Sequence, residues 1–271
     1  MSQFTLHTQI QIQLYYHRQL KASIAMPPVD AIMRFQGPGT RSRLSGVVSV
    51  IAIDGPVAAG KTAVGRALAQ RLGFRYLDTG VMYRAITWLA LRDGLPIEDE
   101  TALGELAETH PVRLIGQESD QVLVGEHQVG EELRGSRVSQ TVSLVARVPS
   151  VRRALVHQQR VLAEEGDIVV VGRDIGTVVL PDAGLKVFLS ASPERRARRR
   201  WRETQGQSQA PEFQQVLAET KARDEIDSHR ADSPLMPAVD AFLLDTDELS
   251  VGQVVERILS RIRELTVAGE R

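Results

Sequence analysis

The chain has 271 residues, of which 42% are hydrophobic and 25% are charged, and its formal net charge is −1. These values are typical of one large globular domain or two small ones, and they give no strong field towards nucleic acid or an acidic membrane. The chain has no cysteine, which excludes disulfides and cysteine-ligated metal and favours a reducing compartment, so we expect a cytoplasmic protein. No apolar run reaches the roughly eighteen residues of a membrane-spanning helix, so we expect no membrane partner.

Residues 1–46 differ in composition from the rest of the chain. They contain five basic residues and one acidic residue, and residues 26–45 include several prolines and glycines. Little periodicity is visible there, which is typical of a loose linker. We therefore predict that residues 1–46 form a disordered basic extension without an assigned function. A transit peptide, which is also basic and poor in acidic residues, is the alternative.

A phosphate-binding loop follows the first strand that the sequence predicts. Residues 47–53 are apolar and β-branched, as in a buried parallel strand, and residues 55–62 match the pattern GxxxxGK[ST]. We expect the Lys61 ammonium to reach the β- and γ-phosphates of a nucleoside triphosphate and the Thr62 hydroxyl to face magnesium. The residues predicted to bind ATP are Gly55, Pro56, Val57, Ala58, Ala59, Gly60, Lys61, Thr62 and Ala63, with Thr62 as the metal ligand.

Five short apolar segments predict an α/β fold, in which one parallel sheet is covered by helices on both faces. They are residues 47–53, 74–77, 168–171, 185–189 and 241–244, and residues 63–72 carry the first helical pattern. Parallel sheets bind their ligands beyond the carboxyl ends of the strands. Because each of these segments ends in polar residues, we expect the functional site to lie there.

A long insertion separates the second and third predicted strands. Residues 112–115 and 121–124 alternate in polarity as paired strands do, with residues 116–120 as their turn. Residues 126–130 are predicted to form a second turn, and a helix is predicted over residues 151–165. We interpret this insertion as a candidate substrate domain.

An arginine-rich segment follows the fourth predicted strand. Ser192, Pro193 and Glu194 predict the start of a helix, and six of the eight residues 195–202 are arginine. Residues 204–211 are predicted to form a mobile loop. Such a run is compatible with a solvated helix face. Beside an ATP-binding loop, the alternative interpretation is a lid that closes over the phosphates and excludes water.

Three further clusters combine arginine with aspartate, over residues 78–84, 172–177 and 223–230. Each of them alone is compatible with a salt-bridge cluster on the surface. Together they supply guanidinium groups for a phosphate and carboxylate oxygens for hydroxyl or amino groups, which are the contacts that a nucleotide acceptor requires. We therefore predict a second nucleotide site next to the ATP site.

Five sequence motifs carry a family resemblance. They are GPVAAGKT, YLDTGVMYRA, VGRDIGTVVLPDA, SPERRARRR and RDEIDSHRADSPLMPAVDAFLLDT. In this order and spacing they resemble the bacterial-type cytidylate (CMP) kinase family, and the resemblance extends over about residues 47–265. It implies a three-layer P-loop kinase core with a parallel five-stranded sheet, a monophosphate-binding insert that contains a small antiparallel sheet, and a short helical lid.

The resemblance also implies a division of the chain into parts. The kinase domain would cover residues 47–271, with its core at 47–80, 150–192 and 212–271, its monophosphate-binding insert at 81–149 and its lid at 193–211. The sequence departs from the family at Ala58, where many members have glycine. We expect the backbone of Ala58 to keep φ below zero.

Individual site residues follow from the same resemblance. The implied catalytic residues are Lys61, Arg173, Arg199 and Arg230, and the implied lid contacts to ATP are Arg196 and Arg200. The implied acceptor-binding residues are Thr79, Tyr83, Arg84, Ser143, Arg152, Arg173, Asp174, Arg223, Asp227 and Arg230. Of these, the phosphate ligands would be Arg84, Arg173 and Arg230, the cytosine contacts Ser143, Arg152 and Asp174, and the ribose contacts Arg223 and Asp227.

The reaction that the resemblance implies is transfer of the γ-phosphate of ATP to CMP or dCMP, giving ADP and CDP or dCDP. The acceptor phosphate has a second pKa near ~6, so it is mostly a dianion at neutral pH and needs no general base. We expect ATP and Mg²⁺ as cofactors, no nucleic-acid partner and a monomeric protein. One alternative is a kinase for another nucleoside monophosphate or for a small metabolite such as shikimate. The other is a P-loop regulator or RNA-binding module that uses the basic extension.

Overall fold

The structure is a computed structural model, and it describes residues 48–115, 121–205, 210–230 and 232–269. All of these residues belong to one compact unit, Arg41–Arg271. Three predictions lie wholly or partly outside the described residues: the basic extension 1–46, the turn 116–120 and the loop 204–211.

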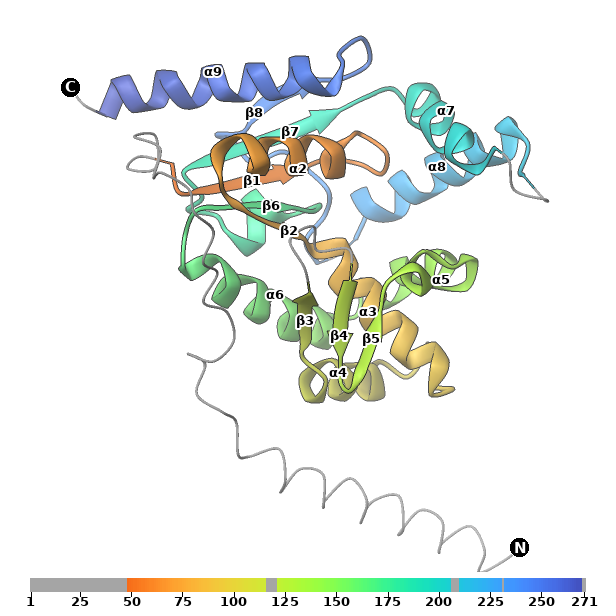
Figure 1. Ribbon diagram of the computed structural model, residues 1–271. Coiled ribbons are helices and arrows are strands. Elements are labelled where there is room, and N and C mark those ends of the chain that lie inside the picture. Colours follow the sequence, from red (N-terminus) through yellow and green to blue (C-terminus); the bar gives the residue numbers. More distant parts are fainter. Residues whose placement is uncertain (1–47, 116–120, 206–209, 231, 270–271) are drawn as a thin grey trace, which may run out of the picture. The chain divides into compact units, whose positions relative to one another are not determined.

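A five-stranded parallel sheet forms the centre of this unit (Figure 1). Its strands, in sheet order, are β2 (Arg75–Asp78), β6 (Ile168–Val171), β1 (Val50–Asp54), β7 (Leu185–Ser190) and β8 (Phe242–Asp245). The five strands predicted from apolar segments are confirmed, with ends that differ by at most a few residues. Because every pairing is parallel, the carboxyl ends of all five strands lie at the same edge of the sheet.

Helices cover both faces of the sheet. In β6, Ile168 and Val170 belong to one hydrophobic core, while Val169 and Val171 belong to a second core on the opposite face. The first core includes residues of α3 (Thr79–Arg92) and α6 (Pro149–Glu164), and the second includes residues of α2 (Lys61–Leu72) and α9 (Val251–Gly269). This alternation produces the predicted three layers. No helix in the described part of the chain is long and apolar enough to cross a membrane.

The predicted insertion contains a small antiparallel sheet beside further helices. Its strands are β3 (Val112–Ile115), β4 (Gln121–Val124) and β5 (His127–Val129), and its helical segments are α4 (Glu100–Thr109), η2 (Glu131–Arg134) and α5 (Ser136–Val145). The prediction of one continuous turn over residues 126–130 is wrong, because β5 occupies most of it. Gly125, with a φ of +58°, and Glu126 form a two-residue hairpin turn that brings His127 opposite Val124.

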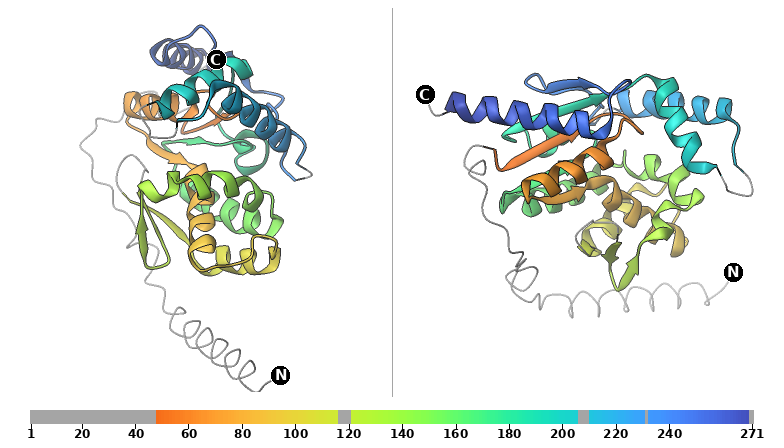
Figure 2. Two further views of the ribbon diagram at one scale, coloured as in Figure 1. Left: turned by 90° about the vertical axis from the view of Figure 1, so that its right-hand side faces the viewer. Right: turned by 45° about the horizontal axis from the view of Figure 1, so that its top comes forward.

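Two helices, α7 (Pro193–Thr204) and α8 (Phe213–Ser228), pack against each other (Figure 2). The predicted start of α7 is confirmed, since the Ser192 hydroxyl caps it by accepting a hydrogen bond from the backbone N–H of Arg195. At the other end, the rings of Trp201 and Phe213 meet edge to face at 6.3 Å. The arginine-rich segment is therefore one arm of a helical hairpin.

The turn from β1 into the phosphate-binding loop requires glycine at position 55. Gly55 has a φ of +147°, a conformation that residues with a side chain rarely adopt. A Cβ atom at this position would lie 2.1 Å from the backbone oxygen of Leu189 in β7. The loop therefore passes directly against the neighbouring strand.

We expect Gly55→Ala to destabilise the fold by about 3 kcal/mol or more, because overpacking against a strand backbone adds to the strained φ. Gly252→Ala is the matched control, since an added Cβ in α9 would meet no atom within 4 Å. There alanine is expected to be neutral or to stabilise by up to ~1 kcal/mol. Urea-unfolding midpoints measure both changes, and a wild-type midpoint for Gly55→Ala would contradict this geometry.

Candidate active site

Most of the predicted site residues line one cleft at the carboxyl ends of the parallel strands. Its lining includes every predicted site residue except Gly55, Pro56 and Arg196. Residues as far apart in the sequence as Ala58 and Arg230 therefore face the same space. The predicted donor loop and the predicted acceptor residues form one continuous site.

Lys61 lines the cleft at the end of the predicted donor loop, close enough to the predicted acceptor residue Arg173 for their charges to interact. Gly60, in a left-handed conformation with φ of +98°, caps α2, and Lys61 is the first residue of that helix. The buried ammonium donates to the backbone oxygens of Gly55 and Pro56, each at 2.7 Å, which uses two of its three N–H donors. Burial, followed by the nearby charge of Arg173, lowers the pKa of Lys61 well below its ordinary value.

The expectation that Ala58 keeps φ below zero is wrong, because its φ is +59°. A left-handed alanine costs roughly 1–2 kcal/mol. Hydrogen bonds to loop carbonyl groups help to hold this conformation: Arg199 donates to the Ala58 oxygen and the Thr246 hydroxyl to the Ala59 oxygen, each at 3.1 Å. The loop shape thus depends on α7 and on the segment after β8.

Among the described residues, predicted acceptor residues form three ion pairs, and the longest of them joins Nε of Arg152 to Oδ2 of Asp232 at 3.7 Å. The guanidinium of Arg152 pairs with the Asp174 carboxylate, and both side chains are buried. Nε of Arg173 donates to Oδ2 of Asp227 at 2.9 Å. Burial alone would raise the pKa of Asp227, but the charge and the hydrogen bond of Arg173 outweigh it and lower that pKa. Asp227 is therefore ionised at neutral pH.

Three further predicted acceptor arginines have no carboxylate partner. Within the described ranges, no Asp or Glu oxygen lies within 4.0 Å of the guanidinium nitrogens of Arg84, Arg223 or Arg230. Burial lowers the pKa of all three, and the adjacent Arg173 helps to lower that of Arg223 to about 10. Nε of Arg223 and both Nε and Nη2 of Arg230 are buried without a hydrogen-bond partner. Such groups are suited to binding an anion.

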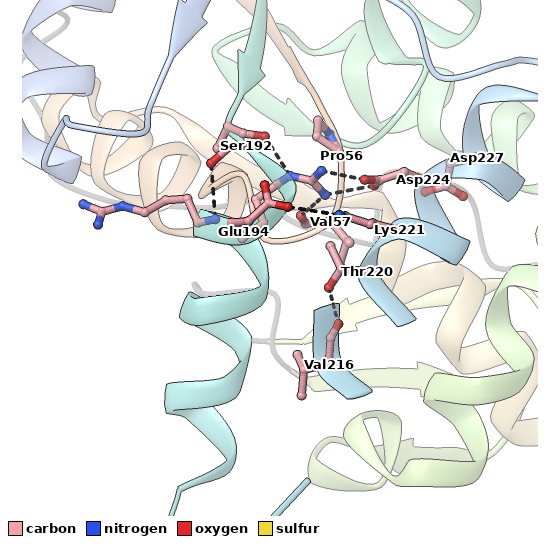
Figure 3. A network of polar contacts seen from close by, with 12 residues as sticks. Pro56, Val57, Ser192, Glu194, Val216, Thr220, Lys221, Asp224 and Asp227 are labelled. Atoms are coloured by element: carbon pink, nitrogen blue, oxygen red, sulfur yellow. Dashed lines mark hydrogen bonds and ion pairs between the residues drawn. The ribbon is translucent and has the colours of Figure 1, made fainter. Parts of the chain in front are cut away.

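The three predicted lid arginines occupy different places. Arg199 donates to the backbone oxygen of Thr246 at 2.6 Å and lines the cleft. Arg200 also lines the cleft, and its charge acts on the acceptor-side arginines. Sequence reasoning grouped Arg196 with the ATP ligands, but the structure places its guanidinium outside the lining, in an ion pair with Asp224. Figure 3 shows Asp224 on α8.

Comparison with known proteins places this chain in a family, because residues 51–264 match the family model for cytidylate kinase. The chain belongs to the cytidylate kinase family. The cytidylate kinase of Caldanaerobacter subterraneus subsp. tengcongensis is 47% identical over 216 residues, covering 80% of this chain and 95% of the relative. That of Rhodococcus jostii is 48% identical over 224 residues, covering 82% and 97%. The shikimate kinase structure from Bacteroides thetaiotaomicron aligns with 17% identity and a TM-score of 0.42, covering 80% and 99%, a likeness too weak to indicate an acceptor.

Asp54 is a buried residue outside the cleft lining that supports the site of this cytidylate kinase family member, and the sequence indicated it only as the polar end of a strand. Its carboxylate accepts hydrogen bonds from the backbone N–H groups of Ile175 (2.8 Å) and Gly176 (2.7 Å). Burial raises the pKa of Asp54 to about 6 and Asp174 adds to the rise, against the opposing backbone hydrogen bonds and Lys61. Asp54 thus ties the end of β1 to the turn that carries Asp174.

Asp78 is a second residue that sequence reasoning did not assign. Its Oδ2 accepts from the Thr62 hydroxyl at 3.0 Å, and its Oδ1 accepts from the Gly80 N–H at 3.0 Å, which caps α3. The predicted metal-side hydroxyl therefore lies beside a carboxylate. The sequence did contain a signal for Asp78. An aspartate that ends a predicted strand directly before a helix stands at a preferred N-cap position.

The raised pKa of Asp54 predicts a pH dependence of stability. Between pH ~4 and ~6 the folded protein binds this proton more tightly than the unfolded chain, so ionisation lowers stability as the pH rises through this range. The loss is expected to be on the order of 2–3 kcal/mol. Asp54→Asn removes this titrating group, so the variant should not show this loss of stability. The difference in unfolding free energy between wild type and variant should therefore change with pH. Urea titrations at pH 4, 5, 6 and 7 measure this difference, and parallel pH profiles would contradict the assignment.

Proposed function

We propose that the cleft binds ATP at the loop and CMP or dCMP among the arginines, and that the protein transfers the γ-phosphate from one to the other. The observation that carries the proposal is the shared cleft, with Lys61 and Thr62 on one side and the unpaired guanidinium groups of Arg223 and Arg230 on the other. Membership of the cytidylate kinase family supports CMP and dCMP as acceptors.

The surroundings of Thr62 are suited to a magnesium ion. Mg²⁺ prefers oxygen ligands and is usually bound by one or two carboxylates together with phosphate oxygens. The Thr62 hydroxyl and the Asp78 carboxylate are hydrogen-bonded neighbours that both line the cleft, so we propose that they hold the ion together with ATP. No cluster of three or more His, Asp or Glu side chains that could hold a metal occurs in the described ranges. When bound, the ion neutralises charge on the β- and γ-phosphates.

The acceptor phosphate is proposed to lie among Arg84, Arg173 and Arg230. Nη1 of Arg84 donates to the Leu133 backbone oxygen and to the Ser139 hydroxyl, each at 3.0 Å, so the insert orients this guanidinium before any ligand arrives. Arg173 is oriented by its bond to Asp227. Preorganised guanidinium groups lose little rotamer entropy when they bind a phosphate, which favours a dianionic acceptor.

The nucleoside part of the acceptor is proposed to contact polar groups on the same side. We assign the cytosine contacts to the Arg152–Asp174 pair and to Ser143, and the ribose contacts to Arg223 and Asp227. The Arg152 guanidinium lies 5.9 Å from the centre of the Tyr83 ring, which limits where a base can lie. The Thr79 hydroxyl donates to the Val171 backbone oxygen at 3.0 Å, so its oxygen is left to accept a bond from the ligand.

Phosphoryl transfer in this cleft needs positioning and charge stabilisation rather than a general base. An oxygen of the dianionic acceptor phosphate forms a bond to the γ-phosphorus while the bond to the β-phosphate oxygen breaks, and ADP leaves. Lys61, Arg199 and Arg200 are proposed to stabilise negative charge on the donor side. Arg173 and Arg230 do so on the acceptor side.

We further propose that the protein acts in the cytoplasm as a monomer, without a nucleic-acid or membrane partner. The near-neutral net charge of −1 supports this proposal, because it gives no strong attraction to polyanions. The five predicted acceptor-binding arginines are also buried or half-buried, so a small phosphate reaches them more readily than a nucleic-acid backbone does; they are Arg84, Arg152, Arg173, Arg223 and Arg230.

An acceptor panel with ATP and Mg²⁺ tests this function. We expect CMP and dCMP to be phosphorylated far faster than AMP, UMP or shikimate. Lys61→Ala should abolish turnover, because it removes the buried ammonium beside the loop. Lys221→Ala is the matched control, since that lysine side chain is 55% exposed and outside the cleft lining, and it should keep near wild-type turnover. Equal rates with AMP or UMP would refute the assignment of cytidine nucleotides.

A further inference from the structure

A buried two-point ion pair joins the two helices of the α7–α8 hairpin. Nη1 of Arg196 donates to Oδ1 of Asp224 at 2.9 Å, and Nη2 donates to Oδ2 at 2.5 Å. The Arg196 side chain is only 3% exposed and that of Asp224 is 23% exposed. Such a fork-to-fork contact fixes both distance and orientation, which a single hydrogen bond does not.

The same guanidinium also contacts two other parts of the fold. Nε of Arg196 donates to the Ala191 backbone oxygen at 2.9 Å, at the entry to α7, and Nη1 reaches the Val57 backbone oxygen at 3.3 Å. Val57 belongs to the donor loop. Figure 3 shows Asp224 on α8 and Val57 on the loop in the same network of contacts. The Arg196 side chain, which belongs to α7, therefore contacts the segment before α7, helix α8 and the phosphate-binding loop.

Both helices carry residues that line the cleft. Arg223 and Asp227 lie on either side of Asp224 in α8, and Asp227 binds the Arg173 guanidinium. In α7, Arg199 holds the Ala58 carbonyl of the loop. Hydrogen bonds thus connect the loop backbone with α7 and, through Arg196 and Asp224, with α8.

A contribution to stability does not by itself explain the Arg196–Asp224 ion pair. Burying an ion pair costs desolvation energy that often cancels the attraction between its charges. The two helices are also joined by Lys221 and Glu194, whose ion pair measures 3.0 Å and whose side chains are 55% and 56% exposed. Neither residue of that exposed pair lines the cleft. What distinguishes the Arg196–Asp224 pair is that Arg196 also contacts the loop at Val57, while Asp224 lies in α8 next to Arg223, which lines the cleft.

We propose that Arg196 and Asp224 are positioning residues that couple the two substrate sites, so that ATP in the loop increases the affinity for CMP and CMP increases the affinity for ATP by the same factor. Ordering of the loop by ATP phosphates fixes the Val57 carbonyl, which fixes Arg196 and, through Asp224, the α8 residues that meet the acceptor. The inference rests on the proposed function, since it takes ATP and CMP as the two ligands.

The test measures the Kd of CMP with and without β,γ-methylene ATP and Mg²⁺, by calorimetry. For the wild type we expect the analogue to tighten CMP binding by at least about fivefold. In Arg196→Lys and in Asp224→Asn this factor should fall below about twofold, because neither variant keeps the two-point contact. Glu194→Gln, which breaks the exposed pair between the same helices, is the matched control and should keep the wild-type factor.

Several outcomes would overturn the proposal. Unchanged coupling in both variants would show that the pair acts only on stability, and equal Kd values with and without the analogue in the wild type would show that no coupling exists. If Asp224→Asn fails to fold, as judged by its urea-unfolding curve, Arg196→Lys decides the question. A wild type that does not phosphorylate CMP refutes the proposed function itself, whereas turnover without coupling overturns the positioning role alone.

Discussion

The arrangement of this cleft depends on positive charge that the protein itself does not neutralise. Arg84, Arg223 and Arg230 lie on the acceptor side without a carboxylate within ion-pair distance among the described residues. Burial lowers the pKa of each, which means that their charged forms are less stable there than in water. We propose that a dianionic phosphate offsets this cost at Arg84 and Arg230, the two of these arginines that the proposed function assigns to it. Their unneutralised charge would then contribute binding energy for the acceptor.

The parallel sheet is what brings this charge to the donor loop. β1 leads into the loop, β6 leads into the turn that carries Arg173 and Asp174, and β8 leads to Thr246. Their common direction places the three segments at one edge. Asp54 then links the first segment to the second through two backbone hydrogen bonds, and Thr246 links the third to the loop. The distances between the loop, the turn that carries Arg173 and Asp174, and the segment after β8 are therefore set by the sheet and by these buried hydrogen bonds.

Sequence reasoning recovered what is encoded locally. The five strands are apolar runs bounded by polar residues, so they could be predicted and were confirmed. The loop is a contiguous motif, so its place between β1 and α2 could be predicted, whereas its ligand contacts remain a prediction. β5 was missed because a three-residue strand has too little alternation to distinguish it from a turn. The left-handed φ of Ala58 and the pairing of Arg196 with Asp224 depend on groups far away in the sequence. Asp54 was overlooked for the same reason, since its two partners lie about 120 residues further on.

The most direct measurement of the central claim compares the binding of CMP with that of cytidine, which lacks only the phosphate. If unpaired arginines supply most of the affinity, two or more charged hydrogen bonds of ~1.5–3 kcal/mol each are lost with the phosphate. Calorimetry should then find cytidine bound at least about 100-fold more weakly than CMP. Dissociation constants within about threefold of each other would contradict the account, because the affinity would then come from the nucleoside and not from the arginines.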